Sequence, residues 1–306
     1  MNSDASNAAL IGIDWGTSSL RAYLIDSQSA VLDMLHTSDG IMEVQNGEFE
    51  ATLTRILEPW LKEAALPVIA SGMITSRNGW METPYLPVPA GANHLANSLE
   101  KVRTSSGPDL HFVTGLTTHH NGAPDVMRGE ETQIIGAIDA GLVNALLVLP
   151  GTHSKWVIVQ EGRIDAFTTF MSGEIFATLR EHTILGKLMK DGAFNEQGFI
   201  QGVSDGYSAG SKLLHRLFQV RTLPLFELLG EEQVSDYLSG MLIGAEISGA
   251  FDKGARPDQI TIIGKHSLAD RYALALQTLE QNIKSADDHI AARGHYIIAK
   301  LAGIIQ

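Results

Sequence analysis

The sequence has no cysteine among its 306 residues. This absence excludes disulfide bonds, thiolate nucleophiles and cysteine-ligated zinc or iron–sulfur sites. The sequence also lacks an apolar run of the roughly 18 residues that a membrane-spanning helix needs. Its first nine residues show neither the basic region nor the apolar run of a secretion signal. We therefore expect a globular, cytoplasmic protein with no membrane partner.

Positive charge is scarce in this chain. Lys and Arg number 22 against 35 Asp and Glu, which gives a net charge of −13. An acidic surface repels nucleic acids and anionic membranes, and this argues against both as partners. Hydrophobic residues make up 44% of the chain, which is enough to build packed cores. The length suits two domains of roughly 150 residues each.

One pattern occurs twice: a short apolar strand, a tight turn rich in Gly, Thr and Ser, and a second strand. The segments are residues 10–15, 16–19 and 20–25 in the first copy, and 145–149, 150–154 and 155–159 in the second. Such turns offer backbone N–H groups and hydroxyls that bind phosphate oxygens. Gly16 and Gly151 are about 135 residues apart, roughly one domain length. The repeat predicts two similar domains that bind one nucleotide, as in an ATP-dependent phosphotransferase.

Each half continues with alternating helices and strands, which predicts an α/β fold of duplicated ribonuclease-H-like domains with an interdomain cleft. The expected domains are residues 1–140 and 141–306, with 190–230 as an insertion. Further elements expected in the first half are strands at 30–35, 68–70 and 111–114, helices at 49–65 and from about 129, and loops at 71–91 and 115–127. Those of the second half are strands at 163–168 and 260–263, an irregular segment at 190–212, and helices at 172–189 with Ser172 as N-cap, 234–251, 267–281 and 288–303.

The first turn has the residue types of a phosphate and metal site. Asp14 directly precedes it, where a carboxylate can hold Mg²⁺ against the phosphates of ATP. The candidate phosphate contacts are Gly16, Thr17 and Ser18. Arg21 on the outgoing strand can reach a transferring phosphoryl group. The alternatives are a turn-capping aspartate, ordinary turn composition and an exposed strand arginine.

The second turn offers a similar set. Gly151 and Thr152 suit a phosphate through backbone N–H groups and a hydroxyl, and Lys155 can neutralise one more charge. His153 is either a donor to phosphate or a solvent-facing turn residue. ATP and Mg²⁺ are therefore the expected cofactors.

The segment 127–132 contains the best candidates for a catalytic base. Glu130 stands in the first turn of an expected helix, where the helix dipole favours the ionised carboxylate that accepts a hydroxyl proton. Glu131 is the alternative, and either residue could simply stabilise the helix. Arg128 beside them suits a substrate carboxylate, which it can bind through two parallel hydrogen bonds.

The loop at 71–91 mixes polar and aromatic side chains, which suits a small polyhydroxy acid. Its candidate contacts are Arg77 as a second carboxylate ligand, Asn78 and the stacking ring of Trp80. A purely structural loop is the alternative.

Residues 13–22 (Ile-Asp-Trp-Gly-Thr-Ser-Ser-Leu-Arg-Ala) resemble the first phosphate motif of the actin-like ATPase and sugar kinase superfamily. Other segments resemble the 2-dehydro-3-deoxygalactonokinase family: 126–133, 149–156, 171–174, 238–246, Gly72-Met73, Trp80 and Pro84-Tyr85. The resemblance implies transfer of the ATP γ-phosphate, with Mg²⁺, to the 6-hydroxyl of 2-dehydro-3-deoxy-D-galactonate in galactonate breakdown.

The resemblance also bears on two sites. Similar hexose kinases have an acid at the start of the helix before the second hairpin, and Glu130 occupies that place, although those enzymes have Asp there. The glycine run that contacts the nucleotide base in the superfamily is reduced here to residues 263–267, which leaves Gly264 as the candidate adenine contact.

Several alternatives stay open at this point. The acceptor could be another 2-keto-3-deoxy sugar acid, such as the gluconate epimer. A phosphohydrolase or a nucleotide-driven clamp could share the fold, but Arg77, Arg128 and the aromatic loop favour an organic acceptor. The sequence leaves the oligomeric state open, and the apolar helix at 234–251 is a candidate interface for a homo-oligomer.

Overall fold

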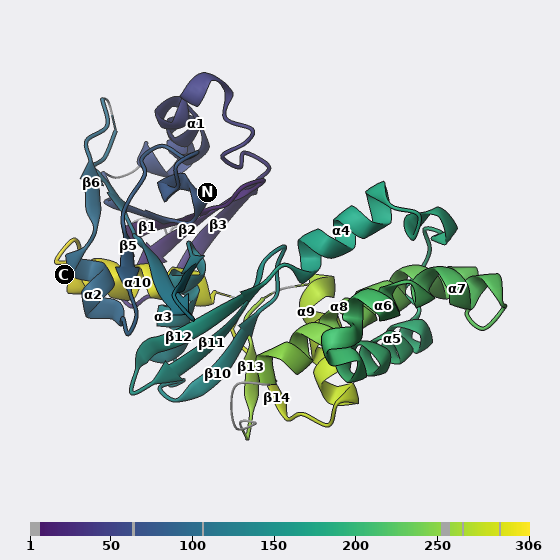
Figure 1. Ribbon diagram of the computed structural model, residues 1–306. Helices are drawn as coiled ribbons and strands as arrows, with labels where there is room; N and C mark the ends of the chain where they lie inside the picture. Colours follow the sequence, from purple (N-terminus) through teal and green to yellow (C-terminus); the bar gives the residue numbers. More distant parts are fainter. Residues whose placement is uncertain (1–6, 63–64, 106, 252–257, 265, 288) are drawn as a thin grey trace. The chain divides into compact units, whose positions relative to one another are not determined.

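The computed structural model describes residues 7–62, 65–105, 107–251, 258–264, 266–287 and 289–306 (Figure 1). The chain divides into two compact units. Unit 1 comprises residues 1–144, 158–166 and 287–306, and unit 2 comprises residues 145–157 and 167–286. No helix in the described ranges is long and apolar enough to cross a membrane.

Unit 1 is built on a six-stranded sheet of order β3-β2-β1-β4-β7-β6. The strands are β1 (Ala8–Trp15), β2 (Leu20–Asp26), β3 (Val31–Thr37), β4 (Val68–Ser71), β6 (Glu100–Val102) and β7 (Leu110–Phe112). The first three strands form an antiparallel meander, and β4 joins β1 in parallel so that Asp14 lies opposite Ser71. The strands and the hairpin expected here from the sequence are confirmed.

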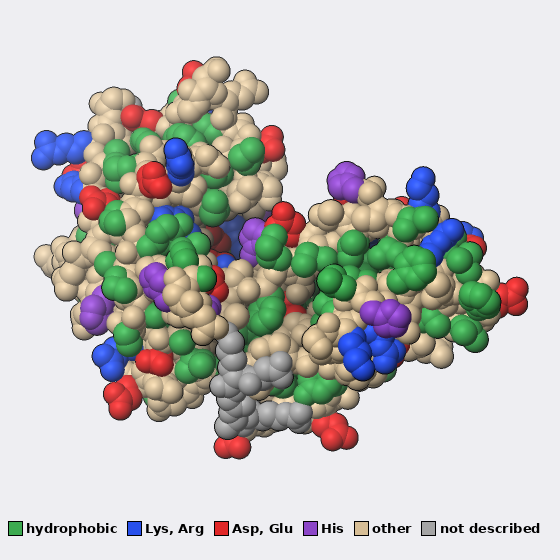
Figure 2. All heavy atoms as spheres, viewed as in Figure 1, with side chains coloured by type: hydrophobic (Ala, Val, Ile, Leu, Met, Phe, Trp, Pro, Cys, Tyr) green, Lys and Arg blue, Asp and Glu red, His purple; other side chains and the backbone are tan. Residues whose placement is uncertain are grey.

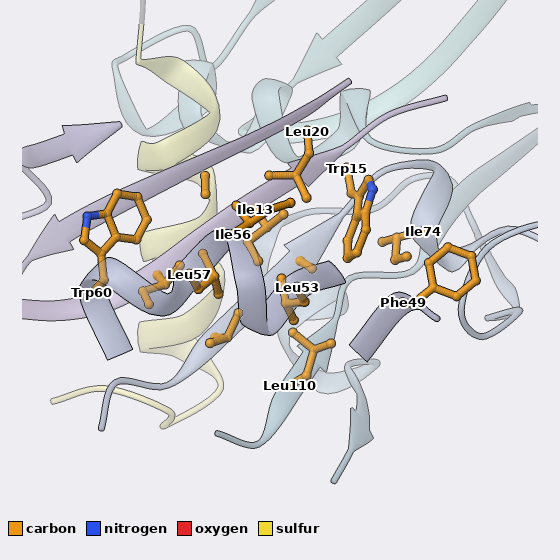
Figure 3. Packing of buried hydrophobic residues seen from close by; sticks show 14 of the residues in the cluster. Ile13, Trp15, Leu20, Phe49, Leu53, Ile56, Leu57, Trp60, Ile74 and Leu110 are labelled. Carbon is orange, nitrogen blue, oxygen red and sulfur yellow. The ribbon is translucent and has the colours of Figure 1, made fainter. Parts of the chain in front are cut away.

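Alternate residues of β1 face two different helices, as the period of a strand requires. Ile13 and Trp15 pack with Leu53 and Leu57 of α1 (Phe49–Leu61) in the apolar core of the unit (Figure 3). Gly12, on the other face, lies against His295 of α10 (Ile290–Leu301), which also packs on α3 (Glu130–Asp139). The sheet is therefore covered by helices on both faces.

The prediction of a polar loop at 115–127 is wrong. This segment is a hairpin of β8 (Gly115–His120) and β9 (Ala123–Met127), which forms a three-stranded sheet with β5 (Tyr85–Pro87). Most of its side chains are exposed or half-buried, so the hairpin lacks the apolar alternation by which strands are recognised in a sequence. Short elements elsewhere in the unit are η2 (Gln45–Gly47), η3 (Met73–Thr75) and α2 (Ala92–Asn97).

The second sheet has the order β12-β11-β10-β13-β14. Its strands are β10 (Ala145–Leu149), β11 (Ser154–Gln160), β12 (Arg163–Phe170), β13 (Ile260–Ile262) and β14 (Ile283–Ser285). The helical elements of unit 2 are α4 (Ser172–His182), η4 (Gly186–Leu188), α5 (Glu196–Ala209), η5 (Gly210–Lys212), α6 (Leu213–Leu217), α7 (Gln219–Leu225), η6 (Glu231–Gln233), α8 (Val234–Phe251) and α9 (His266–Thr278). The second hairpin and the helix at 234–251 are confirmed.

The prediction of an irregular segment at 190–212 is wrong, because most of this segment is the helix α5. Its glycines face α8 rather than breaking the helix. A Cβ at Gly202 would lie 2.1 Å from the Tyr237 carbonyl oxygen, and a Cβ at Gly240 of α8 would lie 2.1 Å from that of Phe199. The two backbones therefore pack closely through a stripe of glycines, which in the sequence resembles a loop. This packing also buries α8 along most of its length, so its assignment as an oligomer interface is wrong too.

The start of α4 differs by one residue from the expected position. Met171 occupies the N-cap and Ser172 is the first helical residue, so the predicted capping role of Ser172 is wrong. The helix ends at His182 rather than near Met189, because Thr183 adopts an extended backbone conformation. The Ser172 side chain instead lies near Glu246, where it opposes the rise in the pKa of that carboxyl that burial causes.

Candidate functional site

Two loops of unit 1 converge on the carboxylate of Asp14 at the end of β1. Gly72, which follows β4, has φ 98°, and a Cβ there would lie 2.7 Å from the Trp15 carbonyl oxygen and 3.3 Å from Asp14 Oδ1. Gly129, which precedes α3, has φ 110°, and a Cβ added there would lie 3.0 Å from the Gly72 Cα. Only glycine combines these backbone angles with so close an approach. The two glycines thus let both loops reach the carboxylate.

Asp14 lies in an environment that disfavours its negative charge. Burial and the nearby charge of Glu130 raise the pKa of Asp14 to about 6, although the Arg21 guanidinium, 3.8 Å away, acts in the opposite direction. Asp14 is partly buried, and the oxygens of a carboxylate are ligands that suit a hard divalent cation. The residues present therefore fit the magnesium ion expected at Asp14 from the sequence.

The tip of the first turn is exposed, and hydrogen bonds from a neighbouring segment hold its backbone. Thr17 and Ser18 are exposed, and the Gly16 N–H donates to the Ser19 carbonyl at 2.9 Å. Behind them, the Ile41 N–H donates to the Gly16 carbonyl at 3.0 Å and the Met42 N–H to that of Thr17 at 3.2 Å. Sequence reasoning missed this support, of which the Ser-Asp-Gly run at 38–40 was the only signal. The free hydroxyls and the fixed backbone suit a phosphate.

The two adjacent glutamates at the start of α3 have different environments. Glu131 is fully buried, and its carboxyl accepts the Gly129 N–H at 2.6 Å. Burial, with the charge of Glu130, raises the pKa of Glu131 to about 8, so this carboxyl is protonated at neutral pH. Glu130 is half-buried and accepts the Arg128 N–H at 3.0 Å. Of the pair, Glu130 offers the accessible carboxylate.

Arg128 is buried and holds the loop at 71–91 in place. Its Nη1 donates to the Thr75 carbonyl at 2.5 Å, to the Thr75 hydroxyl at 2.7 Å and to the Thr83 hydroxyl at 2.6 Å. Its Nη2 donates to the Thr83 carbonyl at 2.9 Å, its Nε to the Tyr85 hydroxyl at 3.3 Å, and the guanidinium stacks 4.2 Å from the Tyr85 ring centroid. These bonds occupy the donors that a bidentate carboxylate pair needs. In this conformation Arg128 is an anchor for the loop.

The other candidates on this loop separate into two kinds. Arg77 and Asn78 are exposed, and Arg77 makes no ion pair with any residue in the described ranges. Trp80 instead packs on the core of unit 1, with its ring stacked 6.3 Å from that of Phe49 and edge-on 5.9 Å from that of Phe112. Packing therefore explains Trp80 without a ligand, whereas Arg77 and Asn78 stay available to one.

A buried histidine supports the same edge of the sheet and was missed from the sequence. His295 of α10 is fully buried, and its Nε2 lies 2.9 Å from the Ser71 hydroxyl, one residue before Gly72. Burial lowers the pKa of His295 to about 3, so the ring is neutral. One histidine among 11 carries no sequence signal of this role.

The neutral state of His295 predicts a pH dependence of stability. The unfolded state, with a histidine pKa near 6.5, binds a proton that the folded state rejects, so stability is present above about pH 6.5 and is lost as the pH falls towards 3. Between pH 8 and 5 the free energy of unfolding should fall by about 2 kcal/mol more in the wild type than in His295→Gln. Urea unfolding at both pH values measures this difference, and equal slopes would contradict the neutral assignment.

The second turn, in unit 2, lies against the start of α4. A Cβ at Gly173 would lie 2.5 Å from the Gly151 carbonyl oxygen, and the Glu174 N–H donates to the Thr152 carbonyl at 3.1 Å. Thr152 and His153 are exposed, and His153 Nε2 lies 2.5 Å from Glu174 Oε2. Lys155 is buried, and its ammonium donates to the Thr169 hydroxyl at 2.9 Å. The exposed tip therefore consists of Thr152 and His153, and Gly151 beside them is half-buried.

A buried carboxyl fixes the elements around this turn. Glu246 of α8 accepts the Trp156 indole N–H and the Tyr272 hydroxyl, each at 2.8 Å, and Tyr272 also contacts the Ser154 hydroxyl at 2.7 Å. Burial raises the pKa of Glu246. The network ties β11, α8 and α9 together directly beneath the turn. Sequence reasoning did not assign Glu246 a role.

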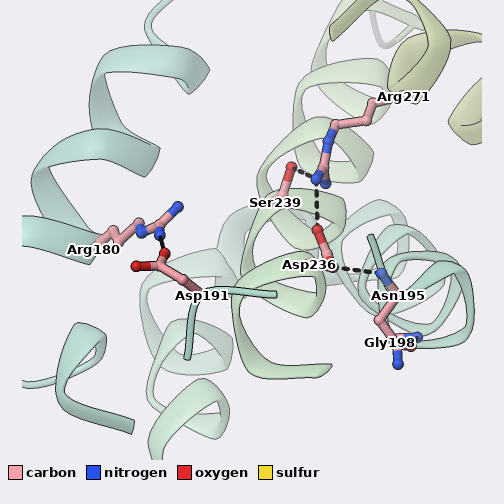
Figure 4. Close-up of polar contacts among 7 residues, drawn as sticks. All are labelled: Arg180, Asp191, Asn195, Gly198, Asp236, Ser239 and Arg271. Atoms are coloured by element: carbon pink, nitrogen blue, oxygen red, sulfur yellow. Dashed lines mark hydrogen bonds and ion pairs between the residues drawn. The ribbon is translucent and has the colours of Figure 1, made fainter. Parts of the chain in front are cut away.

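A cavity of about 160 Å³ lies beside the second turn. It is lined by Gly151, Ser172, Gly173, Phe176, Arg180, Ser235, Ser239, Leu242, Ile243, Leu268, Arg271 and Tyr272. Arg271 is held in it by Asp236 at 2.6 Å and Ser239 at 3.3 Å (Figure 4). Gly264 adjoins the same turn, since its Cβ would lie 3.6 Å from Pro150 Cδ, whereas Lys265 of its motif lies outside the described residues.

Comparison with known proteins agrees with this geometry. Residues 14–298 match the family described as 2-keto-3-deoxy-galactonokinase. The 2-dehydro-3-deoxygalactonokinase of Escherichia coli K12 is 36% identical over 272 residues, which cover 89% of this chain and 90% of that protein. A crystal structure from Sinorhizobium meliloti, proposed to be a 2-dehydro-3-deoxygalactonokinase, has a TM-score of 0.88 and 32% identity over 95% of this chain and 98% of its own.

A more distant structure bears on the fold alone. The ligand-bound xylulose kinase of Lactobacillus acidophilus superposes with a TM-score of 0.53 at 8% identity, covering 97% of this chain and 90% of that chain. The expected fold, that of the actin-like ATPases and sugar kinases, is confirmed. With the match spanning nearly the whole chain, the protein belongs to the 2-keto-3-deoxy-galactonokinase family.

Proposed function

We propose that this protein is a cytoplasmic, ATP-dependent kinase that phosphorylates the 6-hydroxyl of 2-dehydro-3-deoxy-D-galactonate. The observation that carries the proposal is the edge of unit 1 where Asp14 and the accessible carboxylate of Glu130 lie together, in a chain of this family. Phosphoryl transfer requires positioning of the reactants, neutralisation of charge and one proton acceptor. At this edge Asp14 would hold the neutralising cation and Glu130 would accept the proton.

In the proposed reaction, Glu130 accepts the proton of the 6-hydroxyl. The hydroxyl oxygen forms a bond to the γ-phosphorus, the bond from the γ-phosphorus to the β–γ bridging oxygen breaks, and ADP leaves with that electron pair. Asp14 would hold Mg²⁺, which neutralises negative charge on the phosphates when bound. Glu131, protonated at neutral pH, keeps the Gly129 N–H fixed and leaves the proton transfer to its neighbour.

Each unit has a turn whose donors suit a phosphate group. Thr17 and Ser18 in unit 1 and Gly151, Thr152 and His153 in unit 2 offer hydroxyls, backbone N–H groups and an imidazole at exposed turns. We assign the nucleotide base to the cavity beside the second turn, since a cavity of about 150 Å³ is large enough for an aromatic ring. Arg21 would face the transferring phosphoryl group.

Arg77 is the proposed ligand of the substrate carboxylate, because Arg128 is occupied by the loop. Arg77→Gln should raise the KM for the sugar acid about ten- to a hundredfold, the loss of a charge-assisted hydrogen bond of about 1.5–3 kcal/mol. The KM for ATP should stay unchanged. Steady-state kinetics with each substrate varied in turn measures both constants.

Arg163→Gln is the matched control, since Arg163 is an exposed arginine of unit 1 whose nearest acid, Glu161, is 3.8 Å away. It should leave both KM values unchanged. If Arg77→Gln behaves like this control, the carboxylate is bound elsewhere.

The substrate assignment is tested by ADP release with a panel of acceptors. The galactonate-derived acid should give the highest kcat/KM, above its gluconate epimer and far above a neutral sugar of equal length. Equal rates with and without any acceptor would instead identify a phosphohydrolase and contradict the proposal.

A further inference from the structure

The helices α6 and α7 form one continuous helical course with apolar residues on both faces. Phe218, between them, has helical dihedrals (φ −67°, ψ −20°). On the inner face, Leu213, Leu217, Val220 and Leu223 pack with α8 in a core of unit 2. A helix with apolar residues on both faces normally has both faces buried, so an exposed outer face would be unusual.

The outer face carries exposed apolar side chains near both ends and in the middle of the helical course. Leu214, Phe218 and Leu225 follow at intervals of four and seven residues, so they share one side of the helical course, and Phe226 and Leu228 continue the patch beyond α7. Their exposed fractions are 86%, 59%, 55%, 74% and 69% respectively. Figure 2 shows hydrophobic side chains gathered at the surface over these helices. We call Leu214, Phe218, Leu225, Phe226 and Leu228 the outer patch.

The size of the outer patch suits an interface. At roughly 150–250 Å² for a large side chain, the exposed fractions amount to about 600 Å² of apolar surface. This reaches the upper end of the patches usual on monomers, about 300–600 Å². It also supplies most of the roughly 800 Å² that each partner contributes to a stable interface.

The two ends of the helical course carry opposite charges. Lys212 precedes the helical course and Glu227 follows it. Both are exposed, and neither forms an ion pair within the described part of the chain. A second copy that runs antiparallel, about a twofold axis between positions 219 and 220, would pair each Lys212 with Glu227 of the other copy. The same register pairs Leu214 with Leu225, and Phe218 with Arg221.

We propose that the protein forms a twofold homodimer through the outer patch. One register satisfies both the apolar contacts and the two charge pairs, and such self-complementarity is the condition for an isologous interface. The antiparallel arrangement also places the positive end of each helix dipole beside the negative end of the other. The dimer involves none of the residues assigned to catalysis, so the dimer proposal can be tested independently of the proposed function.

The test is sedimentation velocity of the full chain from about 1 to 50 µM, with mass confirmed by light scattering. The wild type should sediment as a dimer and Phe218→Glu as a monomer, with unchanged circular dichroism and thermal unfolding. Met42→Glu is the control, because Met42 is an equally exposed apolar residue (67%) of unit 1. It should remain dimeric.

A charge exchange tests the register itself. Lys212→Glu and Glu227→Lys should each weaken dimerisation by about fivefold or more, because both symmetry-related pairs become like-charged. The double variant should restore wild-type affinity. A wild type that stays monomeric at all concentrations, a dimeric Phe218→Glu, or a double variant weaker than either single one would each overturn the proposal.

Discussion

Glu130→Gln is expected to lower kcat by about 10²–10⁴-fold, the usual contribution of a general base. Glutamine keeps the size of the side chain and can still accept the Arg128 N–H, but it cannot take up a proton. Both substrates should therefore bind normally. Steady-state and single-turnover kinetics, with binding of each substrate followed by calorimetry, separate the chemical step from affinity.

Glu131→Gln is the matched variant one residue away. The Glu131 carboxyl is already protonated at neutral pH, and it accepts the Gly129 N–H, which an amide oxygen can also do. Its kcat should fall much less than that of Glu130→Gln. If Glu131→Gln is the inactive variant and Glu130→Gln the active one, the base is Glu131. If both stay active, the proton acceptor lies elsewhere.

Asp14→Asn is expected to abolish turnover almost completely while the fold persists. The amide removes the charge that would hold Mg²⁺, but it removes no core contact. Because burial disfavours the ionised form of Asp14, the variant should be at least as resistant to thermal unfolding as the wild type. The measurements are kcat over a Mg²⁺ titration and the Tm of the same samples.

Asp109→Asn is the control for this variant, since Asp109 is an exposed aspartate of unit 1 that forms an ion pair with Lys101. It should retain full activity. Near-normal turnover of Asp14→Asn at saturating Mg²⁺ would rule out the metal role.

The parts of the fold that could be predicted are those with strong local patterns. The strands around the two turns are short apolar runs bounded by Gly, Thr and Ser, and α8 is a long, strongly apolar stretch. The hairpin of β8 and β9 could not be found in this way, because its stability comes from pairing with β5 rather than from an apolar face. The helix α5 was hidden by glycines whose purpose, close packing on α8, depends on a partner more than 30 residues away in the chain.

In the candidate site, too, local sequence patterns could be read, whereas tertiary contacts could not. Asp14 and Glu130 could be proposed from the sequence because each stands at a recognisable position, the end of a strand and the start of a helix. The distinction between Glu130 and Glu131 needed burial, which depends on how α3 packs. Arg128 was predicted to bind the substrate carboxylate, but its donors are taken by Thr75, Thr83 and Tyr85, which are far from it in sequence. His295 and Glu246 act through tertiary contacts alone.

The most direct test of the central claim is the structure of the reaction product. The protein is incubated with ATP, Mg²⁺ and 2-dehydro-3-deoxy-D-galactonate, and the product is examined by phosphorus NMR with proton coupling. We predict a phosphate monoester whose phosphorus couples to the two protons on carbon 6, formed in equal amount with ADP. Inorganic phosphate in place of this ester, or a phosphorus coupled to another carbon's proton, would contradict the account.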